Sequence, residues 1–355
     1  MHFSSRLLQW YAQNGRTLPW RQTRDPYIVW VTEILLQQTR VDQGMEYFYR
    51  FTEAFPNVAS LAAAPLDEVL RLWQGLGYYS RARNLHQAAR DIMEQRNGKL
   101  PESYKEWLKV KGVGPYTAAA ISSIAFNEPV AALDGNVYRV LARLFAIDER
   151  IDTGRGKKVF DEVASELIDQ NDPGGFNQAM MDFGATVCKP AAPLCRECIF
   201  NRECLAFLNQ QVEKLPVKKP RKASRIRHFN YFYIFFENQD GRRLFFVNQR
   251  KDDDIWKNLY ELPLIETSGE IKPEAVGNLP EWKEWFAGSP DFVMQGSPFF
   301  FRHLLTHQSI HARFFQIKIK PENAVNFTLF FQMVDHKRFE KMPKSKLTLS
   351  FLYKI

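Results

Sequence analysis

The sequence lacks the features of several familiar protein classes. No run approaches the roughly 18 consecutive apolar residues that a membrane-spanning helix needs. The first 20 residues mix Arg6, Gln9, Gln13 and Arg16 with their apolar side chains, unlike the apolar core of a secretory signal. Internal repeats and low-complexity segments are also missing. These absences predict a soluble, cytoplasmic protein.

Cysteine is missing from the whole chain except for one short segment. All four cysteines lie between positions 188 and 204, separated by six, two and five residues: Cys188, Cys195, Cys198 and Cys204. Structural disulfides of a secreted protein are usually spread so that they staple a fold. Clustered thiols indicate a metal site instead, and the spacing by itself fits either a zinc ion or an iron–sulfur cluster.

Length and charge set broader limits. The 355 residues exceed one typical domain, and the 45% of hydrophobic residues is enough for real cores, so two domains are expected. Lys and Arg number 48 against 40 Asp and Glu, a formal net charge of +8. This excess fits a polyanionic partner and a merely soluble basic protein equally well.

Residue periodicity divides the chain into three parts. Residues 1–211 show helical spacing, with a first helix opened by Asp25-Pro26. Residues 212–228 are rich in Lys, Arg and Pro and predict a basic linker, which could lie along a phosphate backbone or be simply solvated. From residue 229 onward, short aromatic and β-branched segments predict an α+β domain. Its strands are expected at 229–236, 244–248, 311–319 and 347–353, with a helix near 281–286.

A glycine hairpin lies between two predicted helices. In Val110–Ala118, Gly112 and Gly114 allow a tight turn that leaves amide N–H groups at the start of the second helix. Such a helix start binds phosphate, although a Gly-x-Gly pair by itself is also an ordinary helix–helix turn. The segment Leu133-Asp134-Gly135-Asn136-Val137, which follows, strengthens the functional interpretation.

These motifs together resemble one family. The matching segments are residues 30–39 (WVTEILLQQT), 75–85 (GLGYYSRARNL), the hairpin, residues 133–137, residues 176–179 (FNQA) and the cysteine spacing. The chain resembles the helix-hairpin-helix glycosylase superfamily, and within it the adenine DNA glycosylases of the MutY type. The resemblance implies an all-α helix-hairpin-helix glycosylase domain with one [4Fe–4S] cluster in loop 188–204. It also implies base excision repair, in which adenine mispaired with 8-oxoguanine or guanine is flipped out and hydrolysed to leave an abasic site.

The resemblance assigns the chemistry to two carboxyl groups. Breaking an N-glycosidic bond builds positive charge on the sugar and requires protonation of the leaving base. By resemblance Glu33 supplies the proton and Asp134 stabilises the oxocarbenium ion, with Tyr116 and Asn136 hydrogen-bonding beside them. Taken singly, Glu33 could be a solvent-facing helix residue and Asp134 a helix N-cap. Relatives that also cut the DNA backbone carry lysine at the position of Tyr116, so this chain is expected to be monofunctional.

Further positions follow from the same resemblance. Gln38, Thr39 and Tyr78 are expected to bind substrate DNA, with Gln38 and Tyr78 at the opposite strand. Arg16, Trp20 and Gln178 are expected to line the adenine pocket. The DNA backbone should contact Gly112, Gly114 and Tyr116. In the second domain Thr306 and His307 are the candidates for contacting the oxidised base.

The second domain resembles the Nudix-like C-terminal domain of the same enzymes. Residues 255–263 (IWKNLYELP) match the strand before the Nudix helix, but the acidic metal-binding box does not follow, so hydrolysis there is not expected. The expected partner is double-stranded DNA containing an adenine:8-oxoguanine pair, bound by a monomer that is nucleoid-associated when it acts. Two alternatives stay open: an enzyme that removes thymine or oxidised pyrimidines, and a non-catalytic DNA-binding or redox-sensing protein.

Overall fold

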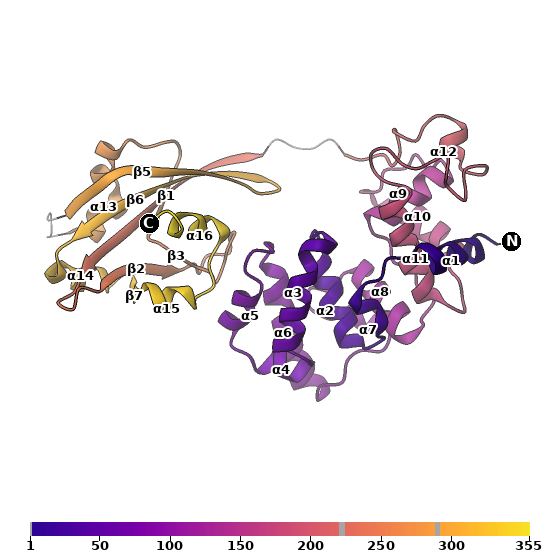
Figure 1. Cartoon of the computed structure of the whole chain (residues 1–355), viewed down its shortest axis with the longest axis horizontal. Coiled ribbons are helices and arrows are strands. Elements are labelled where there is room, and N and C mark those ends of the chain that lie inside the picture. Colours follow the sequence, from indigo (N-terminus) through magenta and orange to yellow (C-terminus); the bar gives the residue numbers. More distant parts are fainter. Residues whose placement is uncertain (1, 220–223, 288–291) are drawn as a thin grey trace. The chain divides into compact units, whose positions relative to one another are not determined.

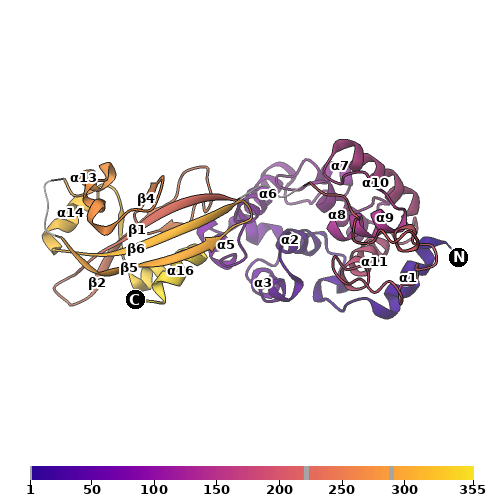
Figure 2. The ribbon, with the colours of Figure 1, turned by 90° about the horizontal axis from the view of Figure 1, so that it is seen from above.

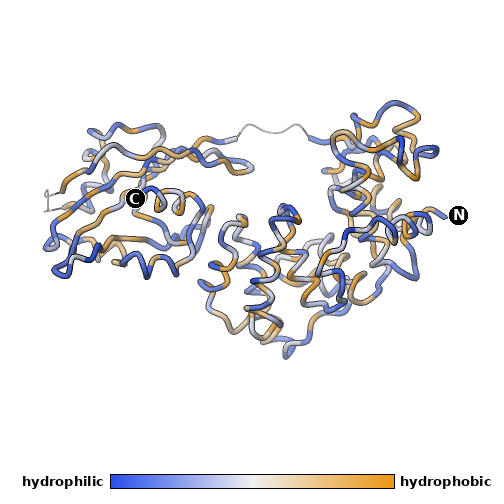
Figure 3. The backbone as a smooth tube through the Cα atoms, viewed as in Figure 1, coloured by the Kyte–Doolittle hydropathy of each residue, from blue (hydrophilic) through white to orange (hydrophobic). Residues whose placement is uncertain are grey.

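The computed structural model describes residues 2–219, 224–287 and 292–355. Contacts between residues within the chain divide it into two compact units. Unit 1 comprises Met1–Ala63 and Asn84–Pro220, and unit 2 comprises Ala64–Arg83 and Arg221–Ile355. Among the described residues, no helix combines the length and hydrophobicity that crossing a membrane requires. Figure 3 shows that hydrophobic and hydrophilic residues alternate along the backbone of both units.

Unit 1 is helical, as predicted. Its helices are α1 (Phe3–Asn14), η1 (Pro19–Gln22), α2 (Pro26–Leu36), α3 (Val41–Ala54), α4 (Val58–Ala63), most of α6 (Ser80–Arg96), α7 (Tyr104–Trp107), α8 (Pro115–Phe126), α9 (Gly135–Leu144), α10 (Gly154–Leu167), α11 (Pro173–Thr186) and α12 (Leu205–Leu208). Helix α2 starts where Asp25 accepts a hydrogen bond from the Tyr27 amide at 2.8 Å, which confirms the predicted cap. Helix α8 packs against α2 and α11, and α9 packs against α11, so these four helices are held together (Figure 1).

Unit 2 contains a mixed β-sheet. Its elements are α5 (Leu66–Leu72), β1 (Arg225–Glu237), β2 (Arg243–Gln249), β3 (Tyr260–Glu261), β4 (Leu264–Thr267), η2 (Pro273–Asn278), α13 (Pro280–Trp285), β5 (Phe292–Leu304), β6 (Gln308–Ile319), η3 (Pro321–Asn323), α14 (Ala324–Phe327), β7 (Gln332–Asp335), α15 (His336–Glu340) and α16 (Lys346–Leu352). The main strand order is β3-β2-β1-β6-β5, with β4 paired to β1 and β7 to β2. Strands β1 and β6 are parallel, and the long strands β1, β6 and β5 lie side by side in Figure 2.

Both faces of this sheet are covered by apolar side chains. Alternate residues of β1 point to opposite faces, because the side-chain period of a strand is two. Phe229, Tyr231 and Tyr233 join one core with α15 and α16, whereas Phe232 and Ile234 join another with α13 and α14. The predicted α+β class of the second part is therefore confirmed.

One predicted strand is wrong. The segment 347–353 lies in helix α16 (Lys346–Leu352) and its C-cap Tyr353 and is not a strand, although Leu347, Leu349, Phe351 and Tyr353 alternate with other side chains. Ser345 caps the helix by accepting a hydrogen bond from the Thr348 amide at 3.1 Å. Leu347 and Phe351, four residues apart, are buried against the sheet, whereas Tyr353 is exposed. Docking of this helical face outweighs the strand-like alternation.

The predicted boundaries between the helical part, the linker and the α+β part also differ from those in the structure. Strand β1 already begins at Arg225, and Leu215 is buried in the core of unit 1, so the basic segment 212–228 is not one continuous linker. Its residues 220–223 lie outside the described residues. Residues 64–83, which the periodicity placed with the helical part, cluster with unit 2. Asp67 accepts hydrogen bonds from Gln249 and Tyr260 there.

Candidate active site

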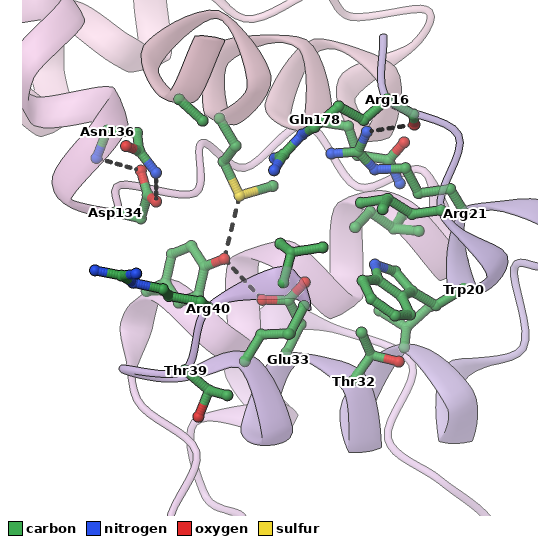
Figure 4. Close-up of a pocket in the computed structure, with 18 of the residues that line it drawn as sticks. Arg16, Trp20, Arg21, Thr32, Glu33, Thr39, Arg40, Asp134, Asn136 and Gln178 are labelled. Carbon is green, nitrogen blue, oxygen red and sulfur yellow. Dashed lines mark hydrogen bonds between the residues drawn. The ribbon is translucent and has the colours of Figure 1, made fainter. Parts of the chain in front are cut away.

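A cavity of about 510 Å³ opens in unit 1, within the range of roughly 300–1,000 Å³ typical of ligand sites. It lies where η1, α2, the start of α3, α8, the start of α9 and α11 meet (Figure 4). Its lining residues are Arg16, Leu18, Trp20, Arg21, Val29, Thr32, Glu33, Leu36, Thr39, Arg40, Val41, Asp42, Tyr116, Ile124, Asp134, Asn136, Gln178, Met181 and Ala185. The four residues predicted to be catalytic are all among them.

Glu33 projects into the cavity from the middle of α2 (Figure 4). It lies among the buried residues of that helix, and one carboxylate oxygen accepts a hydrogen bond of 2.7 Å from the hydroxyl of Tyr116 on α8. Burial raises the pKa of Glu33 to about 7; nearby Asp134 also raises it, while the Tyr116 bond and Arg21 lower it. A carboxyl group with such a pKa carries a proton for much of the time at neutral pH and can act as a general acid.

Asp134 faces the cavity from the start of α9. Its Oδ1 accepts hydrogen bonds from the backbone amides of Asn136 and Val137, each at 2.8 Å, and its Oδ2 accepts one of 2.7 Å from the Asn136 side chain. Burial raises the pKa of Asp134, and these three bonds oppose that rise. Asp134 is thus a helix N-cap and also a cavity residue. The three donors fix its orientation, which a carboxylate needs in order to face one point of a substrate.

The hydrogen bond that holds the Asn136 side chain in place was not predicted from the sequence. Arg139, buried one turn further along α9, donates to Oδ1 of Asn136 at 2.8 Å. The same guanidinium donates to the carbonyl oxygens of Cys188 and Gly184 at 2.7 and 2.6 Å. A chain of hydrogen bonds therefore connects the backbone at the first cysteine with the carboxylate of Asp134. The available signal was a pair of arginines, Arg139 and Arg143, spaced four residues apart among the apolar residues of α9.

Sequence reasoning also missed Asp182, which holds one end of the cavity in place. Its side chain on α11 is fully buried and accepts two hydrogen bonds from Arg21, at 2.6 and 2.7 Å. Arg16 donates to it as well, through its backbone amide and its guanidinium. Burial acts to raise the pKa of Asp182, but the bonds with Arg21 and Arg16 outweigh it and the net pKa is lowered. The predicted cavity residue Arg16 is thereby oriented by a carboxylate 166 positions away.

The other predicted residues of unit 1 divide into two groups. Trp20, Thr39 and Gln178 line the cavity, and Gln178 also accepts a hydrogen bond of 3.0 Å from Tyr11. Gln38 is not among the lining residues; it is exposed just after α2, with a left-handed backbone (φ 57°). The structure therefore brings Trp20, Thr39 and Gln178 to the same hollow as Glu33, but not Gln38.

The glycine hairpin has the predicted local geometry. Gly112 has φ 80°, a conformation that favours glycine, and an added Cβ would lie 2.7 Å from Cβ of Asn84. Gly114 is the N-cap of α8, and Pro115 takes the first helical position. Lys111 is exposed beside the turn, and no lysine is among the described residues that line the cavity.

Unit 2 holds the two predicted lesion-contacting residues, Thr306 and His307, and the predicted opposite-strand contact Tyr78. Tyr78, Thr306 and His307 are exposed and line a second hollow of about 430 Å³, together with Trp256. The hydroxyl groups of Tyr78 and Thr306 form a hydrogen bond. Within this unit the structure thus brings Tyr78 together with Thr306 and His307, which lie more than 220 positions further along the sequence.

The four cysteines surround one small, apolar space in unit 1. Cys188, Cys195, Cys198 and Cys204 line it together with Arg143. The buried guanidinium of Arg143 donates to Sγ of Cys188 at 3.5 Å and to the carbonyl oxygen of Lys189 at 2.7 Å. The sequence therefore identified four thiols that do converge, and this set can hold a metal ion or a cluster.

Comparisons with known proteins give the family. Residues 31–166 match the model of the HhH-GPD superfamily base excision DNA repair proteins. The adenine DNA glycosylase of Buchnera aphidicola subsp. Acyrthosiphon pisum is 36% identical over 269 residues, which cover 76% of this chain and 75% of that protein. The adenine DNA glycosylase of Rattus norvegicus is 32% identical over a match that covers 92% of this chain and 72% of that protein. A solved thermostable thymine-DNA glycosylase matches 58% of this chain and 95% of its own, with 30% identity and a TM-score of 0.55. The chain therefore belongs to the adenine DNA glycosylase family of the HhH-GPD superfamily.

Proposed function

We propose that the protein is a monofunctional DNA glycosylase that removes adenine paired with 8-oxoguanine or guanine and leaves an abasic site. The observation that carries this proposal is the pair of carboxyl groups, Glu33 and Asp134, on the lining of one cavity. One of them has a pKa raised to about 7, as a proton donor requires. The identity of the base comes from the names of the curated relatives compared above, which are adenine DNA glycosylases.

The chemistry follows from the two environments. The base has to leave the duplex before these side chains can reach it, which is the purpose of base flipping. Protonated Glu33 delivers its proton to the adenine ring as the N-glycosidic bond breaks. Asp134, oriented by its three donors, stabilises the positive charge that develops on the sugar, and water completes the hydrolysis. Tyr116 and Asn136 position the two carboxyl groups.

The residues of the cavity favour base removal without strand cleavage. Cutting the strand through a Schiff base needs an amine that attacks the sugar. Among the described lining residues there is no lysine, and Tyr116 directs its hydroxyl to Glu33. A phenol cannot form a Schiff base. The proposed product is therefore an intact strand with an abasic site.

Removal of thymine is the second candidate, since a solved relative at 30% identity is a thymine-DNA glycosylase. The match to that structure covers 58% of this chain, whereas the match to the adenine DNA glycosylase of Rattus norvegicus covers 92% of this chain. The extra coverage includes unit 2 residues, and we propose that Thr306 and His307, with Tyr78, contact 8-oxoguanine in the opposite strand. The backbone of the duplex is proposed to contact Gly112, Gly114 and Tyr116, and Gln38 to contact the opposite strand.

The cysteine set fits an iron–sulfur cluster better than a zinc ion. Around one zinc ion, with Zn–S bonds of about 2.3 Å, sulfur atoms lie about 3.8 Å apart. Among the described residues, one group of metal-ligand side chains has its ligand atoms within 4.8 Å of one another. This group includes none of the four cysteines. We propose that these cysteines hold one [4Fe–4S] cluster, which would fix the fold of loop 188–204. No step of base removal passes through it.

The decisive experiment compares defined DNA duplexes. The iron-loaded chain, as a monomer, is incubated in excess over duplexes with adenine opposite 8-oxoguanine, adenine opposite guanine, or thymine opposite guanine. Breaks that appear only after alkali, at adenine and fastest opposite 8-oxoguanine, would support the proposal. Release of thymine but not adenine would replace it with the second candidate, and breaks before alkali would contradict monofunctional action.

The raised pKa values predict a bell-shaped pH profile. Glu33 has to be protonated, so base release should fall about tenfold per pH unit above its pKa of about 7. Asp134 has to be ionised, and its raised pKa predicts a second fall on the acid side. Single-turnover rates between pH 5 and 9 at saturating DNA measure both limbs. A rate that still increases at pH 9 would exclude Glu33 as the acid.

A further inference from the structure

A second set of metal-ligand side chains lies in unit 2, away from the cysteines in sequence and in the other compact unit. His228, Glu270 and His311 place their ligand atoms, two imidazole nitrogens and a carboxylate oxygen, all within 4.8 Å of one another. Neither the proposed base removal nor the proposed lesion contact uses these residues.

The two histidines are brought together by the sheet. His228 on β1 and His311 on β6 are direct partners in the parallel ladder, so their side chains stand next to each other on one face. The rings meet edge to face, with centroids 5.3 Å apart. Strand pairing therefore fixes their separation, and a ligand would not have to order two flexible segments to use both.

This part of the sheet face is polar where the rest is apolar. Further along the same face, Phe232 and Phe315 belong to the hydrophobic core under α13 and α14. His228 and His311 are not members of this core, although the ring of the exposed Phe300 contacts His311. Nε2 of His311 is buried and has no hydrogen-bond partner among the described residues. A buried polar atom normally has a partner, and an unpaired ring nitrogen is a potential metal ligand.

Glu270 is held against the histidines by Arg313, which lies two residues after His311 on β6. Its guanidinium donates to Oε2 of Glu270 at 2.5 Å and to the carbonyl oxygen of Ile271. This fixes the loop between β4 and η2 and leaves Oε1 of Glu270 without a hydrogen bond in the described part of the chain. Carboxylates that bind metals are commonly oriented by such a second hydrogen bond.

We propose that His228, His311 and Glu270 bind one divalent transition-metal ion, for which zinc is the probe. Two imidazoles and one carboxylate are the donor set of zinc and non-haem iron(II) sites that keep a further position open, whereas Mg²⁺ and Ca²⁺ prefer sites made of oxygen atoms. The adjacent positive charge of Arg313 lowers the affinity, so binding is expected to be weaker than at a closed four-ligand site. The ion ties β1, β6 and the loop before η2 together.

A hollow borders one of the three proposed ligands, Glu270. A hollow of about 540 Å³ in unit 2 is lined by Glu270, Lys272, Pro273, Pro298, Phe300 and Arg313. It reaches Glu270, and the ring of Phe300 lies 6.1 Å from that of His311. An exchangeable ion can therefore approach the Glu270 carboxylate from this hollow without unfolding of the sheet.

The test is a zinc titration of the full, iron-loaded chain against a chromophoric chelator. One saturable zinc ion per chain is expected, with the affinity reduced at least tenfold in His311→Asn, His228→Asn and Glu270→Gln. His2→Asn, which replaces an exposed histidine of unit 1, is the matched control and should bind as the parent does. Iron content measured on the same samples separates this zinc from any ion at the cysteines.

Two results would overturn the proposal. One is no saturable zinc binding by the parent chain, and the other is binding that all three variants retain, which would place the ion elsewhere. Loss of folding does not confuse the test, because Glu270 is exposed and its replacement by glutamine leaves the core intact; circular dichroism checks each variant. Base release by the variants is expected to be unchanged, so the proposal stands or falls separately from the proposed function.

Discussion

Glu33→Gln is expected to reduce single-turnover release of adenine by about 10³-fold, within the range of general-acid catalysis. Glutamine has nearly the same shape and can still accept the hydrogen bond of 2.7 Å from Tyr116, so the cavity should keep its form. It cannot deliver a proton to the base. The measurement is base release at saturating DNA with the enzyme in excess, together with the affinity for a duplex that contains adenine opposite 8-oxoguanine, which should change little.

Asp42→Asn is the matched control for Glu33. Asp42 lines the same cavity at the start of α3, but it is exposed. Its replacement also exchanges a carboxyl group for a carboxamide, and it is expected to alter base release by less than about tenfold, because exposed charges are screened. Similar losses in both variants would mean that net charge, and not a proton from Glu33, accounts for the effect.

Asp134→Asn is expected to slow base release by on the order of 10²–10³-fold, comparable to the loss of one electrostatic contact to a transition state. Asparagine is as good an N-cap as aspartate, so α9 should remain intact. What disappears is the negative charge that faces the sugar. The measurement is again the single-turnover rate, with thermal unfolding recorded on the same samples to follow stability.

Asp172→Asn separates catalysis from capping. Asp172 is the N-cap of α11, where it accepts a hydrogen bond of 3.0 Å from the Gly175 amide, and it is not among the residues that line the cavity. Both substitutions exchange one capping residue for another, but Asp134→Asn also loses the hydrogen bond from the Asn136 side chain, so its unfolding midpoint should fall somewhat more than that of Asp172→Asn. Only Asp134→Asn should lose activity. Equal activity of the two variants would leave Asp134 with a purely structural role.

Local signals predicted the elements that carry these residues. The Asp25-Pro26 start of α2, the glycine hairpin before α8 and the Asp134 cap of α9 depend on side-chain and backbone chemistry within a few residues, which sequence displays directly. Alternation failed for residues 347–353, because the same pattern can dock as a helix when two of its side chains, Leu347 and Phe351, meet a sheet.

Long-range contacts could not be predicted in the same way. Asp182 supports Arg16 and Arg21 from another helix, and Arg139 connects Asn136 with the backbone of Cys188. No local spacing encodes such pairs, since each partner is chosen by how helices pack. The pairing of His228 with His311 likewise depends on the parallel register of β1 and β6.

The sequence by itself determined which parts of the chain are helical and α+β, where the four thiols lie, and which family the motifs resemble. Motifs and periodicity depend on residues that are close together in the chain, so they can be recognised without a structure. Tertiary structure decided that Glu33 and Asp134 share one cavity and that Gln38 lies outside its lining. It also decided the proton affinity of Glu33, because burial raises the pKa of a carboxyl group only when surrounding elements exclude water from it.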